Sequence, residues 1–222
     1  QQGQSVTDIL IYYGEDTNVT AQFGSGLPVI PMGYNYDFAS PDVLLNNITV
    51  KGGKLVTKTG MSYGALLVAG QTAFMSERIK ERLSELEAQG ACIFHSYSEL
   101  EKIQTAPDCI SDSDIRFVHR RLQGGREIYW INKPSDDYRS VTVSLRISGR
   151  KPAIWHPEDG RIEDATYRFE NGRTLVSFDM VPDDAVFIVL DKKTSVSEYN
   201  AEDLDTENMT HSRATVVDGT WN

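Results

Sequence analysis

DILIYYGEDTNVTAQFGSGLPVIPMGYNYD, residues 8–37, is the stretch that decides the fold of the first half of the chain. Around its start, residues 6–13 are rich in β-branched and aromatic side chains and are followed by a glycine, which predicts a buried strand. Two acids, Glu15 and Asp16, stand at the carboxyl end of that strand. The glycines and prolines that follow predict a loop, and this loop ends in the tyrosine-rich segment 34–37.

After this loop, strand and helix patterns alternate. Residues 48–57 predict a hairpin around two glycines, and residues 63–69 predict a second buried strand. Residues 76–89 carry apolar side chains at helical spacing, and residues 91–94 predict a third strand. Because such alternation is typical of a parallel sheet covered by helices, we predict a small α/β domain, flavodoxin-like or amidotransferase-like, over residues 1–107.

The second half of the chain has a different period. Its apolar residues alternate with polar ones, and short turn segments separate the runs, which predicts an all-β sandwich over residues 108–193. Residues 104–112 have little pattern and predict the linker, while residues 194–222 predict a polar, acidic tail, either disordered or docked elsewhere. The predicted strands are 115–121, 127–132, 140–147, 153–156, 165–170, 174–179 and 185–190.

The composition of the 222-residue chain argues against a nucleic-acid partner. Its formal net charge is −10 and its pI about 4.9, whereas nucleic-acid backbones are bound by clustered Lys and Arg. No apolar run in the sequence approaches the ~20 residues of a membrane helix, so no membrane span is expected. Cys92 and Cys109 are the two cysteines, and their spacing leaves open whether they form a disulfide.

The tyrosine-rich segment contains three candidate sugar-binding residues, Tyr34, Tyr36 and Asp37. Tyrosine combines a flat apolar face with a polar tip, a mixture that suits sugar rings with CH patches and hydroxyls. The alternative is a packed loop whose tyrosines anchor it to its own domain. The sequence leaves both interpretations open.

Two basic candidates, His119 and Arg121, fall on one predicted strand. Because side chains alternate along a strand, both point to the same face. They would either bind an acidic sugar or pair with carboxylates of the chain itself. Trp130 and Trp155 are predicted on strands or at their ends. Core packing is the favoured interpretation for both, and an exposed sugar platform is the alternative.

A catalytic role for Glu15 and Asp16 is not predicted. Neighbouring residues usually point apart, and acids after a strand commonly cap a turn, whereas glycoside hydrolysis needs two carboxyl groups facing one bond. The sequence has no phosphate loop, dinucleotide glycine fingerprint, metal-type Cys/His spacing or nucleophile elbow. We therefore predict no catalytic residue, no metal and no cofactor.

Four short segments of the chain are distinctive: YYGED at 12–16, GYNYDF at 33–38, GMSY at 60–63 and FVHRR at 117–121. Together they resemble glycoside hydrolase family 106, the α-L-rhamnosidases, in the region that follows the catalytic barrel. The similarity extends from about residue 8 to residue 190.

This resemblance implies a function for a part of an enzyme. Members of the family are secreted or periplasmic bacterial enzymes that remove rhamnose from plant polysaccharides, and their catalytic domain is a barrel. Such a barrel takes ~250 residues, more than this chain contains. The resemblance therefore implies a non-catalytic, carboxyl-terminal accessory part whose partner is the barrel and which lends residues to the sugar-pocket rim. The alternatives are a stand-alone carbohydrate-binding module and an oligomerisation module.

Overall fold

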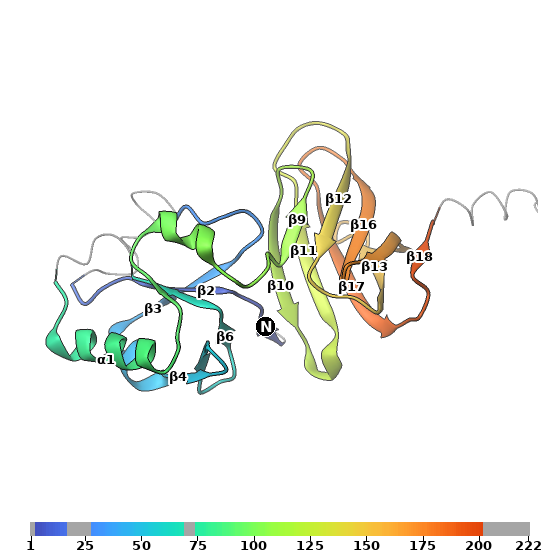
Figure 1. Ribbon diagram of the computed structural model, residues 1–222. Coiled ribbons are helices and arrows are strands. Elements are labelled where there is room, and N and C mark those ends of the chain that lie inside the picture. Colours follow the sequence, from blue (N-terminus) through green and yellow to red (C-terminus); the bar gives the residue numbers. More distant parts are fainter. Residues whose placement is uncertain (1–2, 17–27, 69–73, 202–222) are drawn as a thin grey trace, which may run out of the picture.

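The computed structural model describes residues 3–16, 28–68 and 74–201. Strands make up 44% of it and helices 15%. Two parts lie side by side in Figure 1, a smaller one with helix α1 (Glu77–Ala88) and a larger one built mainly of strands. The first strand, β1 (Gln4–Ser5), lies at their junction, because it pairs with β10 (Arg116–Arg121) of the larger part.

The smaller part contains two sheets and short helices. Its parallel sheet has the order β3-β2-β7-β8, with β2 (Ile9–Tyr12), β3 (Tyr36–Ala39), β7 (Ala65–Leu67) and β8 (Ile93–Phe94). Its antiparallel sheet consists of β4 (Ile48–Lys51), β5 (Lys54–Thr57) and β6 (Ser62–Tyr63). A π-helical turn, η2 (Val43–Asn47), and a 3₁₀-helix, η3 (Tyr97–Lys102), complete it.

The prediction of a flavodoxin-like or amidotransferase-like α/β domain is wrong. The parallel sheet is small, its strands are two to four residues long, and α1 is the one regular α-helix among the described residues. The hairpin predicted over residues 48–57 is confirmed, with Gly52 and Gly53 at φ 57° and 74° in its turn. After this turn the chain continues in an antiparallel sheet. A doubly wound fold would have a helix covering the parallel sheet at this position.

Strand β2 is fully buried, which explains its uninterrupted apolar sequence. Leu10 and Tyr12 pack in one cluster with the apolar face of α1, while Ile9 and Ile11 belong to a cluster that also contains residues of β7, β8 and η3. The predicted helix is confirmed. It begins after Ser76, whose hydroxyl accepts a hydrogen bond from a backbone N–H of the first turn.

The larger part consists of two antiparallel sheets whose inward-facing apolar side chains form one core. The six-stranded sheet has the order β1-β10-β11-β17-β13-β14, with β11 (Glu127–Asn132), β17 (Ala185–Lys193), β13 (Arg150–Trp155) and β14 (Ile162–Asp164). The five-stranded sheet has the order β18-β15-β16-β12-β9, with β18 (Glu198–Tyr199), β15 (Thr166–Glu170), β16 (Arg173–Met180), β12 (Arg139–Leu145) and β9 (Cys109–Ser111). A 3₁₀ turn, η4 (Gln123–Gly125), joins β10 to β11.

The start of the predicted tail is docked, because β18 pairs with β15. Residues 202–222 of that tail lie outside the described residues. Cys92 and Cys109 are both free thiols. Within the ranges that the structure describes, no helix is long and apolar enough to cross a membrane. The predicted domain boundaries stay a prediction.

Candidate functional site

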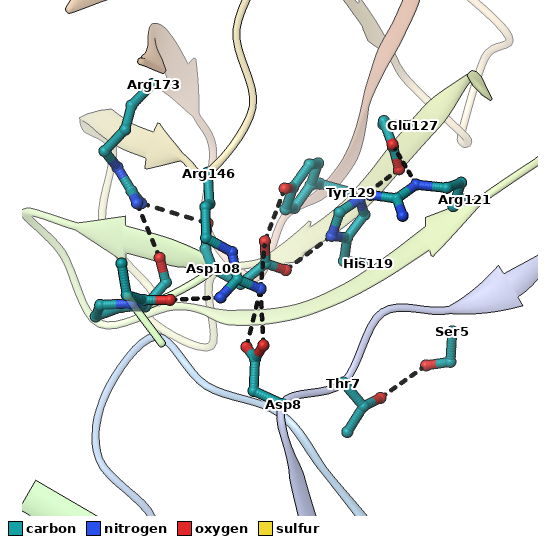
Figure 2. Close-up of polar contacts among 12 residues, drawn as sticks. Ser5, Thr7, Asp8, Asp108, His119, Arg121, Glu127, Tyr129, Arg146 and Arg173 are labelled. Carbon is teal, nitrogen blue, oxygen red and sulfur yellow. Dashed lines mark hydrogen bonds and ion pairs between the residues drawn. The ribbon is translucent and has the colours of Figure 1, made fainter. Parts of the chain in front are cut away.

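Charged and polar side chains from both parts meet at the junction (Figure 2). Asp8 lies just before β2 of the smaller part. The others come from the linker, from strands of the larger part and, for Arg146, from the position just after β12. We call this group the junction cluster; it comprises Asp8, Asp108, His119, Arg121, Glu127, Tyr129, Arg146 and Arg173.

His119 lies at the centre of the junction cluster between two carboxylates. Its Nδ1 is 2.8 Å from Asp108 Oδ2 and its Nε2 is 2.9 Å from Glu127 Oε2. The ring also stacks on Tyr129, with centroids 3.8 Å apart, and the Tyr129 hydroxyl donates to Asp108. Because carboxylates accept and imidazolium nitrogens both donate, this geometry suits a doubly protonated ring.

Electrostatics favour the same charge state. Burial on its own lowers the pKa of His119, but hydrogen bonds to Asp108 and Glu127 outweigh it and raise that pKa above its ordinary value. Burial likewise would raise the pKa of Glu127, yet hydrogen bonds from His119 and Arg121 lower it. His119 is only 2% exposed. Such a buried and saturated imidazolium holds strands together and is poorly placed to exchange protons with a substrate.

Arg146 connects the two parts of the fold. Its guanidinium donates to both carboxylate oxygens of Asp8, at 2.8 and 3.1 Å, and lies 3.6 Å from Asp108. Burial raises the pKa of Asp8, although the charge and hydrogen bonds of Arg146 partly offset this. Arg173 adds hydrogen bonds to the backbone oxygens of Pro107 and Asp108 in the linker. Partly buried, charge-assisted contacts therefore join the two parts.

A groove of about 510 Å³ adjoins the junction. Its walls are the loop before β3, including Gly33 and Tyr34, and residues of β9 and β10, including Arg116. The carbonyl of Gly33 accepts hydrogen bonds from the backbone N–H groups of Asp108 and Cys109. The loop wall of this groove is thus tied to the linker.

The structure separates the predicted sugar-binding residues. Tyr34 is buried and its hydroxyl donates to the carbonyl of Thr105 at 2.7 Å. Asp37 accepts a hydrogen bond from Tyr63, and Tyr36 packs edge-on against Phe38. These contacts agree with the alternative of a packed loop, although Tyr34 also lines the groove.

The two basic candidates lie on β10, apart from the tyrosine segment. His119 is enclosed in the junction cluster, whereas the side chain of Arg121 is 57% exposed and pairs with Glu127. Arg121 also lines a second hollow next to η4. A substrate-binding role stays a prediction for all five candidates, Tyr34, Tyr36, Asp37, His119 and Arg121.

Glu15 caps the helix rather than facing a partner acid. Its carboxylate accepts hydrogen bonds from the backbone N–H and the hydroxyl of Ser76 at 2.6 and 2.9 Å. Among the residues described, no group of three or more His, Cys, Asp or Glu side chains is arranged to hold a metal ion.

Sequence reasoning missed six members of the junction cluster: Asp8, Asp108, Glu127, Tyr129, Arg146 and Arg173. One signal was present for Glu127, because a charged residue at an inward position of an otherwise apolar strand needs a charged partner. The ion pair between Asp8 and Arg146 joins residues 138 positions apart, and no local pattern indicates it.

Trp130 and Trp155 lie outside the core, contrary to the favoured interpretation. Trp155 is 39% exposed and Trp130 is partly exposed. Neither belongs to the cluster of buried side chains between the two sheets.

Comparison with known proteins agrees with the resemblance noted in the sequence. The sequence model of the family described as alpha-L-rhamnosidase matches residues 1–99 and 96–169. A protein of Formosa agariphila named "Putative beta-glucuronidase" is 26% identical over 232 residues, which cover 85% of this chain and 19% of that protein. The rhamnosidase from Novosphingobium sp. PP1Y shares the fold with a TM-score of 0.81 and 24% identity, over 89% of this chain and 24% of that one.

The chain therefore spans about a fifth to a quarter of the length of these relatives. The family match covers well over half of the chain, so the resemblance is confirmed. This chain belongs to the alpha-L-rhamnosidase family, Glyco_hydro_106.

Proposed function

We propose that this chain is a non-catalytic, carboxyl-terminal region of a larger glycosidase, in which it braces the catalytic domain. Its matches to relatives four to five times longer support a role as one part of an enzyme. The names of the relatives support a sugar chain as the substrate of the whole protein, with terminal rhamnose as the first candidate. We infer an extracellular or periplasmic location from the family, and we propose domain boundaries after residues 107 and 193.

The observation that carries this proposal is the engagement of three carboxylates, those of Glu15, Asp108 and Glu127, in contacts within the fold. Hydrolysis of a glycosidic bond needs two carboxyl groups on opposite sides of the sugar, ~5 to 10 Å apart. Glu15 is engaged at the start of α1, while Asp108 and Glu127 are buried around His119. These acids stabilise the fold, and none of the three faces an open cleft as half of a catalytic pair.

The junction cluster suits a brace. A domain that positions another must be rigid, and buried charge-assisted hydrogen bonds fix geometry more strictly than apolar contacts. If the region reaches the sugar-pocket rim, Arg121, Tyr36 and Asp37 are the predicted residues with exposed surface.

The test is an activity measurement on the 222-residue chain. We expect no release of nitrophenol from an aryl α-L-rhamnoside or an aryl β-glucuronide, while an intact rhamnosidase assayed in parallel is active. Turnover that disappears on Glu15→Gln or Asp16→Asn would refute the proposal.

A further inference from the structure

An apolar row crosses the outer face of the six-stranded sheet, with one residue from each of its strands except β1. The register of the sheet places Val118 of β10 opposite Trp130 of β11, and Trp130 opposite Phe187 of β17. Phe187 in turn lies opposite Trp155 of β13, which pairs with Ile162 of β14. We call these five residues the aromatic row.

The aromatic row faces away from the core. The neighbours of its members along the strands, such as Tyr129, Ile188 and Ile154, are buried between the two sheets. Because side chains alternate along a strand, the row must point to the opposite face. Val118 is 43% exposed and Ile162 is 59% exposed. Exposed aromatic and aliphatic side chains gathered on one face commonly mark a binding surface.

The dimensions of the row suit an extended chain of sugar rings. Neighbouring strands lie about 4.8 Å apart, so Trp130 and Trp155 on alternate strands are roughly 10 Å apart with Phe187 between them. Aromatic rings on a sheet offer flat apolar faces that pack against the CH faces of pyranose rings. Polar residues on the same face, Arg116 and Asn132, border the row and can reach hydroxyl groups.

The charge of this sheet is opposite to that of the whole protein. The chain has a net charge of −10, yet the six-stranded sheet carries seven Arg and Lys residues against four acids. Of these acids, Glu127 is buried, Asp191 pairs with Arg126, and Glu163 and Asp164 of β14 pair with Arg161 and Lys151. The basic residues of the sheet are Arg116, Arg120, Arg121, Arg150, Lys151, Lys192 and Lys193. Because side chains alternate along a strand, Arg116 and Arg120 share the face of Val118 and the aromatic row, whereas Arg121 lies on the face of His119. A basic surface around an aromatic row attracts an anionic ligand.

We propose that the outer face of the six-stranded sheet binds a uronate-bearing polysaccharide. Sugar rings stack on Trp130, Phe187 and Trp155, and carboxylates of the polymer approach Arg116 and the basic strand ends. This inference rests on the proposed function, because it gives the accessory region the task of holding the polymer. A covering protein domain is the other occupant of such a face, but a row one residue wide with charged borders fits a polysaccharide better.

The binding test uses the full chain with two acidic polymers, rhamnogalacturonan and polygalacturonate, and neutral galactomannan. Affinity electrophoresis and titration calorimetry should show saturable binding to the acidic polymers that weakens as salt is raised. Trp155→Ala should weaken binding at least tenfold, and Trp155→Tyr should restore most of it. Arg116→Ala should weaken binding several-fold and reduce the salt dependence. Tyr138→Ala is the matched control, because Tyr138 is 79% exposed and lies just before β12 of the other sheet.

Three outcomes would overturn the inference. They are no saturable binding to either acidic polymer, equal binding to galactomannan, and unchanged binding by a folded Trp155→Ala chain. Folding of each variant is checked by circular dichroism and by its urea midpoint. A dimer that Trp155→Ala dissociates, without polymer binding, would identify the face as a protein interface. None of these results touches the proposed lack of turnover, which the aryl-glycoside assay tests separately.

Discussion

Replacing His119 with leucine should destabilise the protein strongly. The change removes both charge-assisted hydrogen bonds of the imidazolium while Asp108 and Glu127 remain buried, with side chains 2% and 5% exposed. The variant must then hold two carboxylates in the interior with fewer partners. Asp108 keeps the Tyr129 hydroxyl, and Glu127 keeps Arg121.

The expected loss is about 3–5 kcal/mol, the usual effect of removing one partner from a buried ion pair. A typical domain is stable by about 5–15 kcal/mol, so His119→Leu should consume a large share of the unfolding free energy. If the penalty comes from the uncompensated carboxylates, the triple change with Asp108→Asn and Glu127→Gln should be more stable than His119→Leu alone.

Urea unfolding followed by circular dichroism measures both differences. His95→Leu is the matched control, because His95 is exposed and the same change there should stay within about 0.5 kcal/mol of wild type. The reasoning fails if His119→Leu behaves like His95→Leu, or if the triple variant is less stable than the single one.

Three further predictions follow from single contacts. Hydrogen bonds to two carboxylates raise the pKa of His119. The contribution of His119 to stability is therefore complete below about pH 6.5 and is lost as the pH rises through the raised pKa. The urea midpoint of the wild type should fall over this pH range, and that of His119→Leu should fall less. Gly33→Ala should lower the free energy of unfolding by about 1–3 kcal/mol, because φ is +88° and the added Cβ would lie 2.7 Å from the Cys109 carbonyl oxygen. Gly90→Ala is the control: φ is +91°, but no heavy atom beyond its chain neighbours lies within 4 Å of the added Cβ, so the melting temperature should fall less. Ser76→Ala should cost about 1 kcal/mol by removing the helix cap, whereas Ser84→Ala on the exposed face of α1 should be nearly neutral in the same melting assay.

Elements that depend on neighbours in sequence were predictable. Helix α1 has a 3.6-residue apolar period and a serine cap, and the β4–β5 hairpin has its two glycines. The period-two runs of the second half also correspond to strands, because each has one face in the core.

The arrangement of the first half was not predictable from these patterns. A short apolar run such as β2 is compatible with any buried strand, so its length and composition do not say how large the surrounding sheet is. The decisive event is the antiparallel pairing of β5 with β6, which depends on where residues 60–63 return after the hairpin. The alternation of strand and helix patterns therefore led to a prediction of a larger parallel sheet than the structure contains.

The candidate sites depend on contacts between distant residues. The sequence EIYWIN of β11 has apolar side chains on both faces, so period two alone does not say whether Tyr129 or Trp130 points inward. The buried polar partners decide this. His119 and Asp108 accommodate the Tyr129 ring and hydroxyl on the inner face, which leaves Trp130 on the outer one.

The aromatic row depends in turn on the order of strands. Trp130, Phe187 and Trp155 are far apart in sequence, and they align because β17 enters the sheet between β11 and β13. The junction cluster thereby orients the outer face as well as the junction. If His119 and its carboxylates determine which faces of β10 and β11 point inward, His119→Leu should weaken polysaccharide binding in proportion to the fraction of unfolded chain. Trp155→Ala should instead weaken binding at least tenfold in chains that remain folded.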